Sequence, residues 1–210
     1  MQYEPIAIDW QLEQTTREDG TRCYTTPSGA VYPSVTTVVG WEKSQQFAEW
    51  RRRNPQESAR VLRRGTAFHS LMEDWIKTGT LQSTPETDLA LQLQSHVHEH
   101  MGKVYGLEVP LWSVLLELAG RTDCVGEYKG KLSVVDFKAS TRAKRADDIE
   151  NYFMQATAYA IMWHERTGQP VEQIVILIAS EDGITQEMIR RPQDFVPQLK
   201  RAIEIYKNRG

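Results

Sequence analysis

Hydrophobic side chains recur at the spacing of an amphipathic helix in three long stretches of the chain. In residues 55–77, apolar positions return every three or four residues after an Asn-Pro pair, and Gly79 follows the last of them. An asparagine before a first-turn proline and a glycine past the end are the usual start and stop signals of a helix. The same period runs through 149–167, where Gly168 follows, and through 194–209. The pattern predicts a helix in each stretch.

Two shorter helices and one unusual glycine complete the helical pattern. Residues 44–53 and 84–101 show the same spacing over fewer turns, so each is predicted to be a helix. Gly65 lies inside the first long helix, where glycine costs about 1 kcal/mol relative to alanine. We therefore expect Gly65 to mark either a kink or a close approach by another backbone or a ligand.

The remaining apolar runs predict β-strands. The run QIVILIAS, at 173–180, is almost entirely apolar, which is typical of a strand covered by helices on both faces. The first forty residues are rich in Thr, Ser, Gly and Pro and predict loops packed around a core. The predicted strands lie at 31–40, 111–120, 121–128, 131–140, 173–180 and 184–190.

The length of the chain, 210 residues, favours a single domain. Residues 55–180 supply a helix, three strands, a helix and a strand, and are predicted to form the core. Residues 1–54 would elaborate it, and 181–210 would add a closing strand and helix. The expected fold class is mixed α/β, with a central mixed sheet flanked by helices.

Composition narrows the classes of protein to which the chain can belong. Hydrophobic residues make up 40% and charged residues 25% of the chain, as in ordinary globular proteins. The start, MQYEPIAIDW, lacks a signal-peptide pattern, and no apolar stretch approaches the roughly 18 residues of a membrane span. A cytoplasmic protein with no membrane partner is therefore expected. Cys23 and Cys124 form neither a zinc-site spacing nor a disulfide framework and are interpreted as reduced packing residues.

Basic residues gather in two local patches although the net charge is −3. That net charge argues against coating of nucleic acid by overall positive charge, but it does not exclude a local binding surface. Taken alone, both patches are interpreted as solvated faces. The first contains Arg51, Arg52, Arg53, Arg60, Arg63 and Arg64, and the second contains Arg142, Lys144 and Arg145.

Three histidines, His96, His98 and His100, lie in the predicted helix 84–101. His96 and His100 are one helical turn apart, a spacing that can hold a metal ion. No acidic residue lies between them at the offset of the zinc-protease motif, and Glu99 is misplaced for that role. A solvated histidine-rich face is the default interpretation.

A predicted hairpin places two aspartates opposite each other. If Lys129 and Gly130 form a two-residue turn, the antiparallel register brings Asp123 opposite Asp136. Directly opposed like charges destabilise a strand pair, so something must offset them. One explanation is a surface quartet in which Arg121 and Lys138, opposed in the same register, neutralise the acids. The other is a divalent cation such as Mg²⁺ or Mn²⁺ held between the carboxylates.

Lys138 strengthens the second explanation. It lies two residues beyond Asp136, so both side chains project from the same face of the strand. A metal ligand beside a fixed cation suits phosphoryl chemistry, because the cation offsets charge that develops on phosphoryl oxygens. Val135 and Phe137 point to the other face, where they can pack on the core.

These residues resemble the signature of the PD-(D/E)XK nuclease superfamily, with Asp123 followed by Asp136-Phe137-Lys138. Further motifs are similar to the RecB-type branch, namely Gly65-Thr66-Ala67-Phe68-His69 as its GTxxH helix and Gln155-x-x-x-Tyr159 as its QxxxY helix. The segment YPSVTTVV followed by a Trp-containing helix is similar to phage exonucleases and to the mitochondrial genome maintenance exonuclease. The resemblance implies a restriction-endonuclease-like core of order αβββαβ with an N-terminal helical and loop elaboration.

The resemblance also implies a catalytic site. Metal ligands would be Asp123, Asp136, the Phe137 carbonyl and His69, with Lys138 as the catalytic cation and Glu73 as a reserve ligand or supporting acid. Gln155 and Tyr159 would brace the site or contact DNA phosphate; a buried polar pair in the core is the alternative for them, as a core histidine is for His69. Thr122 replaces the proline that gives the motif its name, and an iron–sulfur cysteine set is lacking.

What the resemblance implies for function is a Mg²⁺- or Mn²⁺-dependent DNA exonuclease that acts on single-stranded or frayed ends. A small nuclease of this kind is similar to phage enzymes of replication, recombination or DNA degradation, which would place it in the bacterial host cytoplasm, in association with replication or recombination proteins. A structure-specific endonuclease and an inactive DNA-binding module on the same fold are the alternatives. Apart from the resemblance, Tyr24, Tyr32 and Trp41 would stack on unpaired bases if they are exposed; packing in the core is the alternative for them. The residues expected to contact DNA phosphates are Arg52, Arg53, Arg60, Arg63, Arg64, Arg142, Lys144 and Arg145.

Overall fold

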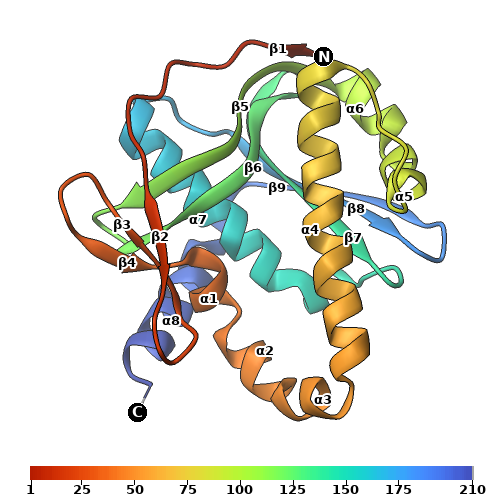
Figure 1. Cartoon of the computed structure of the whole chain (residues 1–210). Helices are drawn as coiled ribbons and strands as arrows, with labels where there is room; N and C mark the ends of the chain where they lie inside the picture. The colour runs from red at the N-terminus through yellow and green to blue at the C-terminus, as the bar shows by residue number, and fades with distance from the viewer. Residues whose placement is uncertain (210) are drawn as a thin grey trace.

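A six-stranded mixed sheet forms the centre of the fold in the computed structural model, which describes residues 1–209 (Figure 1). β5, β6 and β7 pair antiparallel, β7 and β8 pair parallel, and β8 and β9 pair antiparallel. The expected mixed α/β class is thereby confirmed. In spatial order the strands are β1 (Gln2–Tyr3), β5 (Met101–Ser113), β6 (Leu118–Tyr128), β7 (Lys131–Ser140), β8 (Gln173–Ser180) and β9 (Thr185–Arg190).

Helices cover both faces of this sheet, because neighbouring residues of each strand point to opposite sides. On one side α4 (Pro55–Thr78) packs over Val135 and Phe137, in a core that also receives α5 (Thr87–Gln92) and α6 (Gln94–His100). On the other side α7 (Glu150–Thr167) and α8 (Val196–Lys207) pack over Val134 and Val125. In Figure 1, α4 and α7 lie on opposite sides of β6 and β7. The predicted order of helix, three strands, helix and strand is therefore correct.

The predicted helix ends agree closely with the structure. Gly79 and Gly168 take left-handed backbone angles and donate their amides to the carbonyls of Trp75 and His164, which ends α4 and α7. The Asn54 side chain does not cap α4, however, because its amide donates to the Trp50 carbonyl. α4 continues without interruption through Gly65.

Gly65 lies in α4 with open space beside it. A Cβ built there would meet no atom within 4 Å, so no other backbone element packs against this position. Of the explanations that the sequence left for this glycine, the structure therefore disfavours close backbone packing and leaves room for a ligand.

The predicted strand at 31–40 is wrong beyond its first residues. β4 (Val31–Pro33) ends early, and α1 (Val35–Val39) follows. The Ser34 hydroxyl accepts a hydrogen bond from the Thr37 amide and caps α1. Val35, Val38 and Val39 are buried at helical spacing, so burial overrides the strand preference of β-branched residues.

The N-terminal elaboration contains more than loops and helices. β2 (Glu13–Thr16), β3 (Arg22–Thr25) and β4 form a separate three-stranded antiparallel sheet. The sequences of β2 and β3 are polar and interrupted by turn residues, so they showed no clear strand pattern. Short helices α2 (Trp41–Gln46) and α3 (Ala48–Arg53) then connect this region to α4, with a break at Phe47 inside the predicted helix 44–53.

Two further boundaries differ from the prediction. The apolar run 111–120 is not one strand: it holds the end of β5, an exposed turn at Val114 and Leu115, and the start of β6. The predicted helix 84–101 is divided at the buried Leu93 into α5 and α6, which lets both helices pack on the same core. Single 3₁₀ turns, η1 (Ala146–Ile149) and η2 (Pro192–Phe195), precede α7 and α8.

Cys23 and Cys124 are buried free thiols. Within residues 1–209, every helix is too short or too polar to cross a membrane.

Candidate active site

The β6–β7 hairpin has the predicted turn and register. Lys129 and Gly130 both take positive φ, of 50° and 75°, as a two-residue type I′ turn requires. Main-chain pairing ends at Cys124 opposite Val135, one step before the aspartates. There the Asp123 carboxylate accepts a hydrogen bond from the Phe137 amide at 2.9 Å. Asp123 thus holds the two strands together where the regular ladder stops.

Asp136, which is buried, and Lys138, which is partly buried, form an ion pair. The Lys138 Nζ lies 2.7 Å from each carboxylate oxygen of Asp136, whose residue is only 3% exposed. Burial raises the pKa of Asp136 to about 6, with Lys138 opposing and Asp123 reinforcing the rise. Arg121 is exposed and makes no ion pair among residues 1–209, so the surface quartet considered from the sequence is not formed.

His69 connects α4 to the two aspartates. Its Nδ1 lies 3.2 Å from Oδ2 of Asp123, and the negative charge of Asp123 raises the pKa of the imidazole. Burial alone would raise the pKa of Asp123, but His69 and Lys138 outweigh burial and lower it. His69 is therefore placed at the site, with a carboxylate partner, and not packed as an isolated core histidine.

Glu108 is a site residue that the sequence analysis missed. Ligand atoms of Glu108, His69 and Asp123 all lie within 4.8 Å of one another. Burial, reinforced by Asp123, raises the pKa of Glu108 to about 7. Glu108 belongs to β5, in a segment that was not predicted as a strand, and it takes a positive φ of 49°. Glu108 lies in the sequence GLEVP, which matches no catalytic motif. Its membership of the site is therefore visible only in the folded structure, where β5 places it beside Asp123 and His69.

The donor set fits a hard divalent cation. Carboxylate oxygens and one imidazole nitrogen converge, and oxygen-rich sets of this kind suit Mg²⁺ or Mn²⁺. The buried Oδ2 of Asp136 has no well-aligned hydrogen-bond donor within residues 1–209, although the Lys138 ammonium lies 2.7 Å from it, so a metal ion at this oxygen would share it with Lys138. Glu73 lines the same pocket but accepts a hydrogen bond from Lys77.

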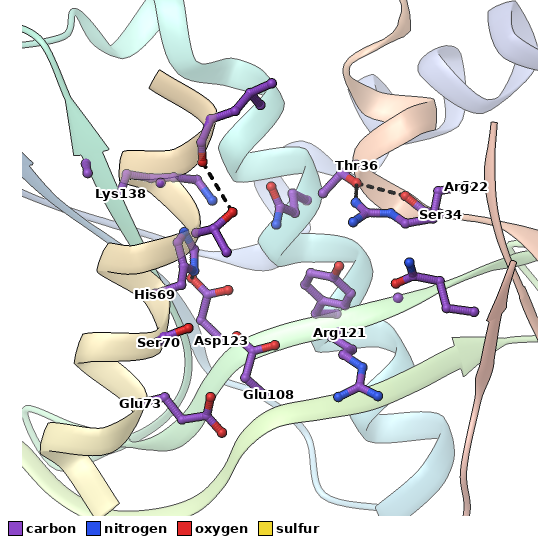
Figure 2. A pocket seen from close by; sticks show the side chains of 18 of the residues that line it. Arg22, Ser34, Thr36, His69, Ser70, Glu73, Glu108, Arg121, Asp123 and Lys138 are labelled. Atoms are coloured by element: carbon purple, nitrogen blue, oxygen red, sulfur yellow. Dashed lines mark hydrogen bonds and ion pairs between the residues drawn. The ribbon is translucent and has the colours of Figure 1, made fainter. Parts of the chain in front are cut away.

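His69, Glu108, Asp123 and Lys138 line one side of a pocket of about 560 Å³, with Asp136 buried behind Lys138 (Figure 2). The α4 wall contributes Gly65, His69 and Glu73, and the opposite wall comes from the N-terminal sheet and the segment that enters α1. Figure 2 shows Arg22, Ser34 and Thr36 facing across the cavity from His69 and Lys138. The pocket therefore lies between the core and its N-terminal elaboration.

Gln155 and Tyr159 line the same pocket from α7 and are both buried. A Cβ added at Gly120 would lie 2.6 Å from the Tyr159 hydroxyl, so only glycine leaves room for this ring. Burial, and then Asp123, raises the pKa of Tyr159 well above its usual value, which keeps the phenol protonated. The pair lies at the site, as the resemblance implied, and its contact with DNA phosphate stays a prediction.

Several arginines predicted to bind DNA are already paired with acids. Arg60 and Arg64 both contact Glu181, at 2.6 Å and 2.7 Å, and Arg64 is buried. Arg53 pairs with Glu49 on the same helix, with Arg52 at 3.9 Å from the same carboxylate. A phosphate that binds Arg64 would have to displace Glu181.

The other predicted contacts lie outside the pocket. Arg63 is exposed on α4, and the second basic patch, which contains Arg142, Lys144 and Arg145, lies in the loop that follows β7. Phe137 is buried in the core with its amide bound to Asp123, and a ligand role for its carbonyl stays a prediction.

Two arginines that the sequence analysis did not select for DNA binding do line the pocket. Arg22 and Arg121 make no ion pair within the described residues, and Arg22 donates instead to the Thr36 hydroxyl. Thr36 in turn contacts the Ser34 hydroxyl at 2.8 Å. The sequence could not show that these groups lie close together, because Arg22 belongs to strand β3 and Thr36 to helix α1.

Of the three aromatic residues expected to stack on bases, one lines the active-site pocket and two lie outside it. Tyr24 lines the pocket and donates its hydroxyl to Gln14 at 3.2 Å. Tyr32 lies outside this pocket, and Trp41 packs edge-on against Tyr206 with ring centres 5.5 Å apart. Tyr24 is only 3% exposed and packs in the core below the N-terminal sheet, which disfavours stacking by its ring; base stacking by Tyr32 and Trp41 remains a prediction.

Comparison with known protein families agrees with this geometry. A family model of the PD-(D/E)XK nuclease superfamily matches residues 86–206, which include both aspartates and Lys138. The chain belongs to the PD-(D/E)XK nuclease superfamily. The RecB-type branch, to which its motifs are similar, is consistent with this assignment.

The curated relatives of this nuclease are exonucleases by name. Mitochondrial genome maintenance exonuclease 1 from Homo sapiens is 28% identical over 175 residues, which cover 73% of this chain and 50% of the relative. The Mus musculus protein of the same name is 28% identical over 174 residues. The chain thus spans about half the length of these relatives.

Among solved structures, a putative exonuclease from Eubacterium rectale is similar with a TM-score of 0.46 and 14% identity. That match covers 70% of this chain and 64% of the other.

Proposed function

We propose that this nuclease is a divalent-metal-dependent DNA exonuclease that hydrolyses phosphodiester bonds at single-stranded or frayed ends. The observation that carries the proposal is the ion pair of buried Asp136 with Lys138, which lines one wall of the pocket beside Asp123 and His69. Burying these charges together costs several kcal/mol in desolvation, which a purely structural role would not require. The name of the relatives from Homo sapiens and Mus musculus supports an exonuclease over other nuclease activities.

Asp123, Asp136, His69 and Glu108 would hold the metal ion, Mg²⁺ or Mn²⁺. When bound, such an ion lowers the pKa of a bound water and offsets negative charge on phosphate oxygens. The carboxylates contribute the charge that attracts the ion. Because its pKa is raised to about 7, Glu108 retains a proton well above the usual range of a carboxyl group, and it would release that proton when it becomes a ligand.

Lys138 would position the attacking water and offset charge on the scissile phosphate. Burial alone would lower the pKa of Lys138, but Asp136 and Asp123 outweigh burial and raise it, so the ammonium stays charged. Its Nζ also lies 5.0 Å from the centre of the Tyr152 ring. These contacts restrict the ammonium to the side of the pocket on which the carboxylates lie.

The opposite wall would hold the DNA strand. Arg22 and Arg121 lack carboxylate partners within residues 1–209, whereas Arg53, Arg60 and Arg64 have them. An unpaired guanidinium binds phosphate without first breaking an ion pair. We therefore assign the backbone of the strand to the wall formed by Arg22, Ser34 and Thr36, which faces Lys138 across the cavity (Figure 2).

The test is cleavage of 5′-labelled linear, 3′-labelled linear and circular single-stranded DNA in Mg²⁺, Mn²⁺ or EDTA, with Lys138→Ala as the control. Loss of the linear strands alone, abolished by EDTA and by the substitution, is expected. Cleavage of the circle would replace the exonuclease with an endonuclease. DNA binding without any cleavage would indicate an inactive binding module.

A further inference from the structure

A second cluster of metal-binding side chains lies outside the pocket. His96 and His100 extend from successive turns of α6, and Glu187 approaches them from β9. One ligand atom from each of the three residues lies within 4.8 Å of the other two. All three side chains are partly buried, and none lines the pocket that contains Asp123 and Lys138.

The elements that carry this cluster are tied together before any ligand binds. The His100 carbonyl, at the end of α6, accepts a hydrogen bond from the Lys129 amide in the hairpin turn at 2.8 Å. The rings of His100 and Tyr128 meet edge to face with centres 5.7 Å apart. Val97, between the two histidines, is fully buried in the core. The two imidazoles are therefore held close together on a fixed helix.

The polar contacts of the cluster leave one carboxylate oxygen directed at the histidines. Oε2 of Glu187 accepts from the Lys129 ammonium at 2.6 Å. Oε1 accepts from the Tyr128 hydroxyl and lies 3.3 Å from Nδ1 of His96, which is itself 3.4 Å from that hydroxyl. A metal ion at Oε1 requires that the hydroxyl hydrogen of Tyr128 rotate away from Oε1 and that the ligating imidazole nitrogens carry no proton. Lys129 lies in an exposed turn and can remain on Oε2.

We propose that His96, His100 and Glu187 bind a transition-metal ion of the Zn²⁺, Co²⁺ or Ni²⁺ class. Two imidazoles and one carboxylate are a donor set that these borderline ions prefer, whereas Mg²⁺ prefers all-oxygen sets. The bound ion joins α6 to β9 beside the hairpin turn, so it stabilises the packing of these elements on the sheet. Metal binding at His96, His100 and Glu187 is proposed independently of the nuclease activity, because none of the three residues belongs to the active-site pocket.

The test is thermal unfolding of EDTA-treated protein, dialysed free of chelator, with and without Zn²⁺ or Co²⁺. An ion at about 100 times its Kd should raise Tm by roughly 5–10 °C in a chain of this size. The rise should be lost in His96→Gln and in His100→Gln. It should persist in His98→Gln, the matched control, because His98 lies on the same helix but packs against Trp75.

A second variant separates this site from the active site. His69→Gln removes the imidazole of the other cluster and should keep the part of the Tm rise that His96→Gln and His100→Gln remove. If His69→Gln abolishes the rise, or if His96→Gln and His100→Gln leave it intact, the proposal is overturned. If a His96 or His100 variant fails to fold, the visible absorption bands of bound Co²⁺ are compared between wild type and His69→Gln. Bands that persist in His69→Gln support the site. Bands that are absent from His69→Gln refute it.

Discussion

The ammonium of Lys138 lies 2.7 Å from each carboxylate oxygen of Asp136, two residues earlier on the same strand; Asp136 is buried and Lys138 is partly buried. The pair is next to Asp123, whose carboxylate bridges the hairpin where main-chain pairing stops. A β-strand places alternate residues on one face, so the D-x-K spacing is enough to bring acid and lysine together. The position of the pair in a pocket then makes the lysine available to a ligand.

Replacing Lys138 should reduce catalysis much more than substrate binding. Lys138→Met is expected to lower kcat by roughly 10²- to 10⁴-fold, because a positioned charge acts mainly on the transition state. Lys138→Arg should not restore the rate, since a planar guanidinium cannot reproduce a compact ammonium. Steady-state kinetics on labelled single-stranded DNA measures both effects. Lys103→Met, at an exposed pair with Glu4, is the control and should leave kcat unchanged.

The partly buried Glu108 should make the metal-free protein less stable as pH rises. Its pKa is raised from 4.5 to about 7, so between these values the native state holds a proton that the unfolded chain has released. The free energy of unfolding therefore falls across that window as pH increases. Glu108→Gln should flatten the fall and raise stability at pH 8 by roughly 1–3 kcal/mol.

Urea unfolding in EDTA from pH 4 to 8 measures this effect. Glu117→Gln is a matched control, because Glu117 also takes a positive φ, of 54°, but is exposed and paired with Lys207. Equal pH profiles for wild type and Glu108→Gln would contradict the assignment of a raised pKa to Glu108.

Arg22 should contribute more to DNA binding than the arginines of α3. Arg22→Gln is expected to raise KM for single-stranded DNA about tenfold with little change in kcat, since it removes one charge-assisted phosphate contact. Arg53→Gln should have a much smaller effect because Arg53 is paired with Glu49. Fluorescence anisotropy with a labelled oligonucleotide in Ca²⁺ checks the binding directly. Similar losses for both variants would show that overall charge, and not the pocket wall, binds the strand.

The local parts of this site could be predicted from sequence because their causes are local. A Lys-Gly turn sets the hairpin register, and the register places Asp123 beside Asp136. Helix ends at Gly79 and Gly168 follow from the left-handed angles that glycine tolerates. The D-x-K spacing and the GTxxH helix then identified Lys138 and His69 as members of one site.

The parts that failed depend on contacts between distant segments. Val35–Val39 has the composition of a strand, but burial against α7 and α8 and the Ser34 cap make it a helix. Glu108 reaches the site only because β5 is longer than its apolar run. Arg64 looked like a free cation until the fold brought Glu181 to it. Such pairings have no signature in the sequence of either partner.

Gly65 offers a test in which stability and activity should change in opposite directions. The position is helical and open, so Gly65→Ala should raise the free energy of unfolding by about 0.5–1 kcal/mol. The added methyl group would enter the pocket that also contains His69 and Lys138, and should raise KM for single-stranded DNA several-fold. Thermal unfolding and steady-state cleavage measure the two effects separately.

Ala59→Gly, on the same helix but outside the pocket, should lower stability and leave KM unchanged. A stabilised Gly65→Ala enzyme that cleaves normally would show that the strand does not pass this face of α4.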